Sequence, residues 1–276
     1  MTDEQDGRSG ADAAFTRVEL INIELWRFEK AGPGVEVYFS GRHGGVSRPP
    51  CDSLNLGFNV GDEAGQVHKN RQLLGRALGH KASTITSPRQ QHTGVVCLLD
   101  NELDIGAGAK WRADSPFDPC DALITGIRQA PLQLQYADCL PLVLIGRGDG
   151  APVIAVVHAG RRGLAAGVIG NTVDTMVARG ADPAAMTAAI GPCIHSCCYQ
   201  VDGETAAGFA GRFGDAVLPG DRLDLPAAAG DELVAAGLTA ERVHVLDICT
   251  CCDGRFFSHR RDGDGTGRQG AIAWIV

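Results

Sequence analysis

The sequence predicts a mixed α/β (α+β) fold, a single-domain sandwich of mixed β-sheets flanked by helices and formed by residues 15–276. Short apolar runs rich in β-branched residues recur along the chain, amphipathic runs with helical spacing separate some of them, and glycine and proline gather in the connections. The acidic start, residues 1–14, has no such pattern and is expected to be a disordered tail.

The apolar runs give the expected strands. The run LPLVLI at 140–145 is continuously apolar, which is typical of a strand buried on both faces. The other runs are bounded by turn-forming residues. The expected strands are residues 35–40, 94–99, 121–125, 131–136, 140–145, 152–157, 187–190, 243–248 and 270–275.

Four segments have helical periodicity. In the second, Leu164, Val168, Thr172 and Met176 recur at i+4 and form one stripe, and Gly180 follows as a helix C-cap. The expected helices are residues 64–78, 164–179, 203–213 and 227–237.

Composition excludes several classes of partner. The chain has 276 residues, 25 basic and 33 acidic, and its net charge of −8 argues against broad binding to nucleic acid or membrane surfaces. No apolar run approaches the ~20 residues of a membrane span. The N-terminal segment lacks the apolar core of a secretory signal, so we expect a cytoplasmic protein with reduced cysteines and small-molecule partners.

His92, Cys139 and His158 are the candidate metal ligands. Cys139 and His158 lie at the ends of apolar runs, where a strand holds a side chain rigidly. Two imidazoles and a thiolate can bind zinc and leave a fourth position open, as in catalytic zinc sites. The alternative from residue types alone is a buried cysteine and two hydrogen-bonded core histidines.

Other candidates follow from their positions beside these residues. Asp138 directly precedes Cys139 and can move a proton or orient a ligand. Arg42 follows an expected strand and precedes two glycines, where it can bind a phosphate or carboxylate. The alternative for Arg42 is a solvated hairpin residue, and for Asp138 a turn residue.

Three more polar residues are candidates for substrate binding. Asn55 faces opposite to its leucine neighbours if its segment is extended. Arg162 lies at the start of an expected helix, whose free N–H groups favour an anion. Arg261, with Arg260 and Arg268, belongs to a glycine-rich loop that can close over an anionic or ribose-bearing ligand. Each is equally compatible with a structural role or a solvated loop.

Two adjacent cysteine pairs, Cys197-Cys198 and Cys251-Cys252, also stand out. The segment CTCC that begins at Cys249 can contribute to a second metal site, but it lacks a partner CxxC at zinc-finger spacing.

In this order, SGRHGGVS, SLNLGFNVGD, QQH, ADCLP, HAGRRG, IGPCI…CCY and FFSHRRDG…TGRQ resemble the bacterial laccase-domain family, long labelled multicopper polyphenol oxidase. Its members are also described as purine nucleoside phosphorylases with adenosine deaminase activity. The resemblance implies one zinc per chain on His92, Cys139 and His158, and a fold related to Cys–His hydrolases. It also implies purine nucleosides (adenosine, inosine, guanosine or methylthioadenosine) and phosphate as substrates.

Two positions depart from the family pattern. Arg161 stands where the family usually has tryptophan, and Gln200 stands where it usually has glutamate. If position 200 contacts the substrate, the glutamine keeps hydrogen bonding but cannot act as a base.

Copper oxidation is disfavoured. The eight histidines include no H-x-H pair, and none of Met1, Met176 and Met186 belongs to a ligand motif. Copper can still occupy a His₂Cys site adventitiously, because N/S sites generally bind Cu²⁺ more tightly than Zn²⁺. The remaining alternatives are a Cys–His amidohydrolase acting on a cell-wall precursor, with Cys139 as nucleophile, and a partner-binding protein with a decayed site.

Overall fold

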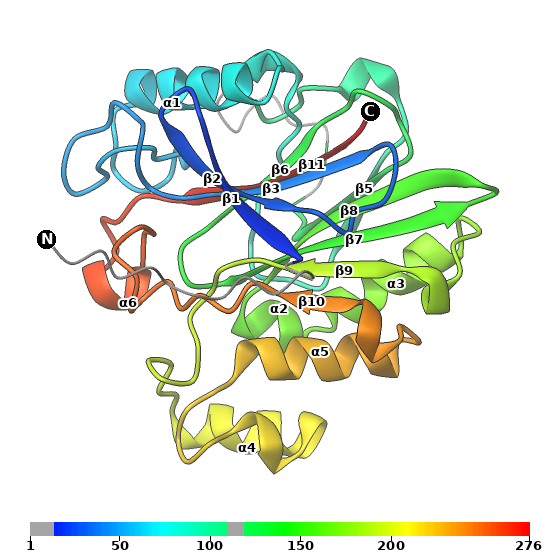
Figure 1. Cartoon of the computed structure of the whole chain (residues 1–276). Coiled ribbons are helices and arrows are strands. Elements are labelled where there is room, and N and C mark those ends of the chain that lie inside the picture. Colours follow the sequence, from blue (N-terminus) through cyan, green and yellow to red (C-terminus); the bar gives the residue numbers. More distant parts are fainter. Residues whose placement is uncertain (1–13, 110–116, 118) are drawn as a thin grey trace, which may run out of the picture.

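Two β-sheets packed face to face carry the fold in the computed structural model, which describes residues 14–109, 117 and 119–276 (Figure 1). The mixed α+β sandwich flanked by helices is therefore confirmed. Apart from Ala14, the expected tail at residues 1–14 lies outside the described residues. No helix in the described part of the chain is long and apolar enough to cross a membrane.

The first sheet has five antiparallel strands in the order β1-β2-β3-β11-β6. The last strand of the chain, β11, lies between β3 and β6, which are both far from it in the sequence. The strands are β1 (Phe15–Leu20), β2 (Ile23–Phe28), β3 (Val35–Ser40), β6 (Leu132–Tyr136) and β11 (Gln269–Ile275).

The second sheet has six strands in the order β10-β9-β7-β8-β5-β4. It is mixed, because β10 pairs with β9 and β4 with β5 in parallel, whereas the other pairs are antiparallel. The strands are β4 (Val96–Leu99), β5 (Ala122–Thr125), β7 (Leu140–Gly148), β8 (Ala151–Ala159), β9 (Thr187–Ile190) and β10 (Val243–Val245).

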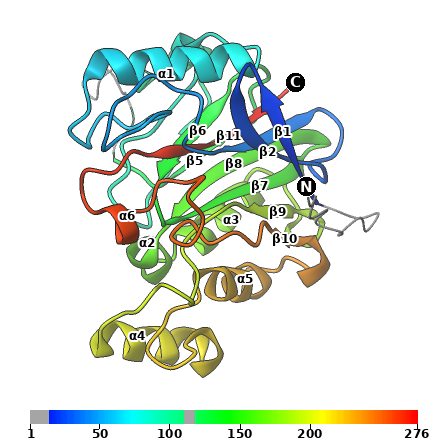
Figure 2. The ribbon, with the colours of Figure 1, turned by 60° about the vertical axis from the view of Figure 1, so that its left-hand side comes forward.

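Helices cover both outer faces of the sandwich. The first sheet is covered by α1, the second by α2, α3 and α5, and α4 lies farther out beyond α5 (Figure 2). The helices are α1 (Ala64–Ala77), α2 (Arg161–Ala165), α3 (Val168–Val177), α4 (Gly203–Phe213), α5 (Leu225–Ala235) and α6 (His259–Asp262). Short 3-10 turns lie at Ala82–Thr84, Glu102–Asp104, Pro183–Ala185, Asp215–Val217 and Ala240–Arg242.

The apolar run of β7, residues 140–145, contributes to the cores on both sides of the second sheet. Leu142 and Leu144 pack on the helix side of the second sheet, whereas Val143 packs between the two sheets. Both faces of this strand are therefore buried, as its continuous apolar run predicts.

The strands β1 and β2 form a hairpin that is absent from the expected strands. The strand β1 reads FTRVEL and has no fully buried residue, and the turn residues Ile21 and Asn22 have positive φ angles of 51° and 65°. Such turns usually contain Asn-Gly or Asp-Gly, and this one has neither glycine nor aspartate, so the sequence lacks the usual hairpin signal.

Residues 164–179, expected as one helix, instead form parts of two helices, α2 and α3. The chain breaks between α2 and α3 at Gly167, which has a φ of 75°. The predicted stripe is buried nonetheless, because Leu164, Val168, Thr172 and Met176 all face the core. The expected helix at 203–213 coincides with α4, and the expected helix at 227–237 begins two residues earlier, at Leu225.

Candidate metal centre and pocket

Strand ends of the second sheet gather the candidate ligands at one edge. Cys139 directly precedes β7, and His158 is the penultimate residue of β8, opposite Pro141 of β7. His92 precedes β4, which runs parallel to β5 and starts at the same edge. Three segments far apart in the sequence therefore meet where rigid strands begin or end.

The three predicted ligands form one group. Their ligating atoms lie within 4.8 Å of one another, and the Cys139 Sγ is 3.7 Å from the His92 Nε2. The centres of the His92 and His158 rings are 4.8 Å apart, and the ring planes are inclined at 67°. His158 is buried, Cys139 is half-buried and His92 is exposed, so the group opens toward solvent on one side.

Asp121, directly before β5, organises two of these segments. Its carboxylate accepts hydrogen bonds from His158 Nδ1 at 2.9 Å, from the His92 backbone N–H at 2.9 Å and from the Thr93 backbone N–H at 2.6 Å. Burial alone would raise the pKa of Asp121, but the bond and charge of His158 and these N–H groups lower it to about 2. The fully buried carboxylate is therefore ionised at neutral pH.

Electrostatics favour a thiolate at Cys139. Burial raises the pKa of this thiol, but the positive charge of His158 and hydrogen bonds with both histidines outweigh burial and lower the pKa to about 6. Burial likewise lowers the pKa of His158, but Cys139 and Asp121 outweigh it and raise the pKa to about 9. Both shifts arise largely from the same attraction between the thiolate and the imidazolium.

The donor set fits a metal ion. The bond from His158 Nδ1 to Asp121 leaves Nε2 as the ring atom that would bind a metal once its proton is released, the arrangement common for histidine ligands of zinc. Gly160 leaves room for the Cys139 side chain, because a Cβ at position 160 would lie 2.6 Å from the Cys139 Sγ. A soft thiolate with two imidazoles suits zinc or copper better than magnesium or calcium.

Asp138 lies beside the metal-binding group in a strained backbone conformation, with a φ of 81°. Its carboxylate accepts hydrogen bonds from the Thr250 hydroxyl and from the Arg260 backbone N–H, both at 2.6 Å. His92 also has a positive φ, 61°. Strained non-glycine residues are concentrated at functional sites, and here two of them border the same cavity.

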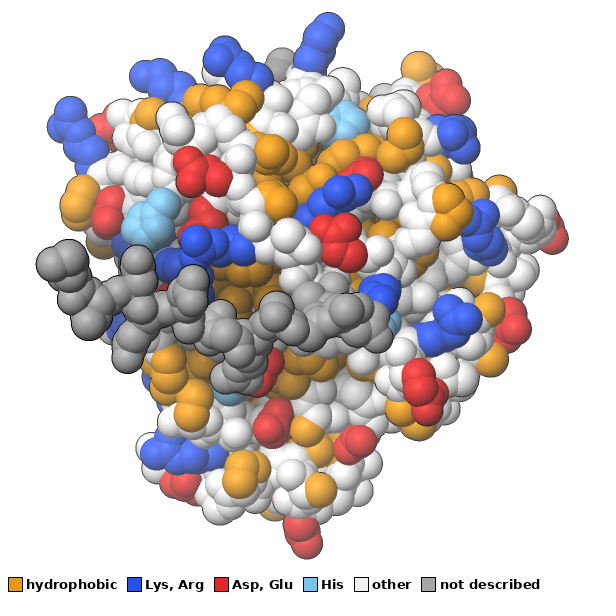
Figure 3. Space-filling model, viewed as in Figure 1, with side chains coloured by type: hydrophobic (Ala, Val, Ile, Leu, Met, Phe, Trp, Pro, Cys, Tyr) orange, Lys and Arg blue, Asp and Glu red, His pale blue; other side chains and the backbone are white. Residues whose placement is uncertain are grey.

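The group opens into a pocket of about 550 Å³, a size within the range of small-molecule sites. Among the described residues, Asp138 is the one carboxylate in its lining, whereas five arginines contribute to it. On the face shown in Figure 3, basic and acidic side chains are interspersed. The arginines are Arg71, Arg89, Arg161, Arg260 and Arg268.

Arg268 is the pocket arginine whose charge is influenced by both Cys139 and Asp138. It is half-buried, donates to the carbonyls of Thr266 and Gly267, and forms no ion pair with a carboxylate in the described part of the chain. Burial lowers its pKa, although the nearby Cys139 and Asp138 favour the charged form. Its guanidinium therefore lies near the metal-binding group without a carboxylate that neutralises it, as is also true of the other four pocket arginines among the described residues.

Arg42 and Arg261, expected to bind substrate, lie outside the pocket lining. Arg42 contacts Asp52 and Asp262 and lies 4.7 Å from the ring centre of Phe257. Arg261 pairs with Asp262 and donates to the carbonyls of Thr250, Cys251, Asp253 and Phe256. Their charges are already satisfied by the protein, so both residues hold loops together.

Asn55, Gln200 and Arg162 also lie outside this lining. Asn55 is fully buried and bonds to Gly57, Asp62 and the Arg268 backbone, so it positions a pocket residue from behind. The Gln200 side chain donates to Asp221 at the surface. Arg162 borders a separate shallow hollow beside α4.

The sequence reasoning missed Asp121 and several residues of the pocket wall. The signal for Asp121 is a carboxylate directly before a fully buried and mostly apolar run, ALIT, at the same kind of strand edge as Cys139. Phe58 and Tyr199 line the wall and stack against Arg71 and Arg260, with arginine–ring distances of 4.5 and 5.1 Å. Arg71 also bonds to loop carbonyls while lining the pocket.

Comparison with known proteins identifies the family of this chain. Residues 36–276 match the model of the multi-copper polyphenol oxidoreductase laccase family. A purine nucleoside phosphorylase of Streptomyces coelicolor is 36% identical, with 88% of this chain and 96% of the relative covered. An adenosine deaminase from an unknown prokaryotic organism is 31% identical, with 90% and 97% covered.

Solved structures agree with this relationship. The YfiH protein of Bacillus licheniformis matches with a TM-score of 0.88 and 29% identity, covering 96% of this chain and all of that one. The YlmD protein of Geobacillus stearothermophilus matches with a TM-score of 0.83 and 30% identity, covering 95% and 98%. The resemblance expected from the motifs is thus confirmed.

Proposed function

Because the chain belongs to the multi-copper polyphenol oxidoreductase laccase family, several of whose members are named purine nucleoside phosphorylases, we propose that it is a zinc-dependent purine nucleoside phosphorylase with adenosine deaminase activity. Adenosine and inosine are the proposed nucleosides. The observation that carries the proposal is a pocket in which five arginines and one carboxylate surround a His₂Cys group.

His92, Cys139 and His158 are the residues that would hold the zinc. Zinc bound there supplies a Lewis acid, which polarises oxygen atoms and acidifies water at neutral pH. Asp121 orients His158 and the backbone at His92. This support keeps the two imidazoles in a fixed relation to the thiolate before any ligand arrives.

The pocket arginines would bind phosphate. Arg161, Arg260 and Arg268 all line the pocket, and none of them has an ion-pair partner among the described residues. In phosphorolysis a phosphate oxygen forms the new bond to the ribose C1′, while the bond from C1′ to the base nitrogen breaks and the base leaves with its electron pair. Guanidinium groups hold the phosphate in place for this displacement and offset its charge.

Phe58 and Tyr199 offer flat apolar surfaces for a purine ring. Each lies in the lining and is backed by an arginine, which fixes the ring plane. The Asn59 amide lies in the same lining and can form hydrogen bonds with the base or the ribose, whereas both Nε2 and Oε1 of Gln90 already bond to the Gln135 backbone.

Asp138 is the proposed proton carrier. In deamination, water adds to C6 of adenine and ammonia leaves, so one water proton must reach N1 of the ring and the other must reach the leaving nitrogen. Asp138 is the one carboxylate lining the pocket in the described part of the chain. The Thr250 hydroxyl and the Arg260 N–H fix its two oxygens in place.

The surroundings of the pocket support zinc over a copper oxidase. Met176 and Met186 lie in the core beside Gly146, so neither is a pocket residue that offers an axial thioether. Copper would bind the same three donors adventitiously, and oxidase activity in a copper-loaded sample would reflect that occupancy.

One observation favours a second candidate, a Cys–His amidohydrolase. The low pKa of Cys139 and its pairing with His158 are also features of a nucleophilic dyad. The two functions are mutually exclusive at one site, because a cysteine bound to zinc is not a free nucleophile.

A nucleoside panel combined with elemental analysis tests the proposal. Zinc-replete protein is incubated with adenosine, inosine and guanosine, each with and without phosphate, and products and bound metal are measured. We expect zinc in the pocket site and phosphate-dependent release of base, both lost in Cys139→Ser. Amide hydrolysis by metal-free protein would support the second candidate instead.

A further inference from the structure

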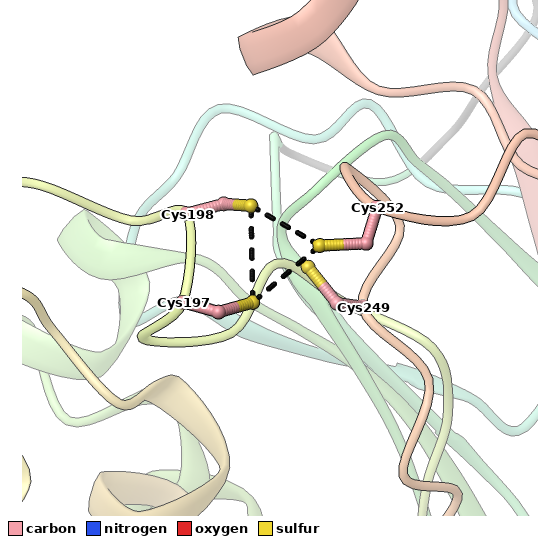
Figure 4. A group of neighbouring side chains, drawn as sticks. All are labelled: Cys197, Cys198, Cys249 and Cys252. Carbon is pink, nitrogen blue, oxygen red and sulfur yellow. Dashed lines mark hydrogen bonds between the residues drawn. The ribbon is translucent and has the colours of Figure 1, made fainter.

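A second group of possible metal ligands, made up of four cysteines, lies outside the pocket lining. Cys197 and Cys198 belong to the turn that follows β9, and Cys249 and Cys252 belong to the turn that follows β10 (Figure 4). All four sulfur atoms lie within 4.8 Å of one another, and their side chains point toward a common centre. We propose that these four cysteines form a structural tetrathiolate zinc site, independent of the proposed catalytic zinc.

The distances fit a single metal ion. Four sulfurs at ~2.3 Å from a tetrahedral zinc lie about 3.8 Å from one another. The Cys197 Sγ lies 3.7 Å from the Cys198 Sγ and 3.6 Å from the Cys252 Sγ, and the Cys198 Sγ lies 3.3 Å from the Cys252 Sγ. Small shifts of side chains would therefore complete the tetrahedron.

The local sequence has the features of a zinc-binding turn. Cys249 and Cys252 are spaced as C-x-x-C, which is common in structural zinc sites. The backbone N–H groups of His195, Cys251 and Cys252 point at the Cys249 sulfur, and such bonds stabilise a metal-bound thiolate. The missing partner pair, Cys197-Cys198, comes from the other turn rather than from a second C-x-x-C.

Charges around the cysteines complement the proposed site. Zinc with four thiolates has a formal charge of −2. Arg222 donates to the Cys197 carbonyl at 2.6 Å, Arg260 to the Cys198 carbonyl at 3.2 Å, and Arg261 to the Cys251 carbonyl at 3.3 Å. Three guanidinium groups thus lie against the backbone of the two turns and would offset the negative charge.

The position of the site gives it a role in holding the pocket wall. The two turns already contact through a bridge between Cys193 and Cys249, and the residues beside them, Tyr199 and Thr250, border the pocket or hold Asp138. A metal that joins the turns would fix Tyr199 relative to Asp138. Cys197 and Cys252 are exposed, so the ion can bind from solvent.

Metal counting on the full chain tests the proposal. Protein is produced with added zinc, purified without oxygen or chelator, and measured by elemental analysis and native mass spectrometry. We expect about two zinc ions per chain in the wild type, and about one in Cys139→Ser or in Cys197→Ser/Cys252→Ser. The control Cys251→Ser, in the same turn but outside the group, should keep both.

A second measurement leaves the four cysteines unchanged, in case the double variant does not fold. Cobalt is added to metal-free Cys139→Ser protein, which retains only the proposed site. The expected result is the absorption of tetrahedral cobalt with thiolate-to-cobalt charge transfer, together with protection of the four thiols from alkylation.

Three results would overturn the proposal: no cobalt binding by Cys139→Ser, alkylation of the four thiols at the same rate with and without zinc, or a disulfide between Cys198 and Cys252 in protein kept anaerobic. None of these outcomes bears on the pocket, because the catalytic zinc is assessed separately in Cys197→Ser/Cys252→Ser.

Discussion

His158 donates from Nδ1 to the carboxylate of Asp121 across 2.9 Å, and both residues are buried. The same carboxylate holds the backbone at His92. One acidic side chain therefore sets the orientation of one proposed ligand and the position of another.

Replacing Asp121 should weaken zinc binding without removing a ligand. In Asp121→Asn the group that accepts from His158 is no longer charged. The single amide oxygen also cannot accept from all the N–H groups that now donate to the carboxylate. We expect the zinc dissociation constant to rise about 10- to 100-fold, measured by competition with a chromogenic chelator. The control Asp100→Asn removes a surface carboxylate paired with Arg179 and should leave the constant unchanged. Equal affinities of the two variants would contradict this role of Asp121.

A single methyl group at Gly160 should disturb the same site by steric contact. Gly160 has a φ of −69°, so alanine causes no backbone strain, but its Cβ would lie 2.6 Å from the Cys139 sulfur. We expect zinc affinity in Gly160→Ala to fall by about tenfold or more, because the thiolate must move. Gly211→Ala is the matched control, since a Cβ there meets nothing within 4 Å. Full zinc content and affinity in Gly160→Ala would argue against Cys139 as a ligand.

Phosphate binding should depend on Arg268 rather than on Arg42. Losing a charged hydrogen-bond partner costs ~1.5–3 kcal/mol, so Arg268→Ala should raise the KM for phosphate roughly 10- to 150-fold. Arg162→Ala, outside the main pocket, should change it less than about twofold. Arg42→Ala should mainly lower thermal stability, because Arg42 is paired with Asp52 and Asp262. A larger effect on phosphate KM from Arg42 than from Arg268 would reverse this assignment.

The reactivity of Cys139 should reveal its environment in metal-free protein. The pKa of this thiol is lowered to about 6, so its alkylation should rise with a midpoint near pH 6 instead of near the ordinary value for cysteine. Because the folded pKa is depressed, the corresponding stabilisation is lost as pH falls toward 6. Because the pKa of His158 is raised to about 9, the attraction is also lost as pH rises through 9.

Thermal stability of the metal-free protein should therefore be highest between about pH 6 and pH 9, and Cys139→Ser should flatten this profile. Added zinc should protect the thiol from alkylation at every pH in that range. A cysteine that is alkylated equally fast with zinc present would support the amidohydrolase alternative.

Much of the architecture follows from local patterns in the chain. Buried strands such as β7 and β8 have continuous apolar sequences, and α4 has its capping Asp202 and a clear periodicity. The hairpin of β1 and β2 could not be predicted, because its stability comes from pairing with β3 rather than from turn residues. The break at Gly167 depends on how α2 and α3 pack, which periodicity alone does not define.

For the site, residue type was a better guide than loop composition. His92, Cys139 and His158 come together because strand ends meet at one edge of the sheet. Arg42 and Arg261 have the same glycine-rich surroundings as Arg268, but carboxylates that are distant or adjacent in the sequence neutralise them. Which arginine stays unpaired is a property of the packed structure, and the sequence does not show it.

The most direct test of the central claim is the identity of the sugar product. Zinc-loaded protein is mixed with inosine and phosphate, and the reaction is followed by phosphorus NMR with quantification of hypoxanthine. The account predicts ribose 1-phosphate in amounts equal to the released base, and neither product from Cys139→Ser. Free ribose without a phosphorylated sugar, or base release at the same rate without phosphate, would contradict it.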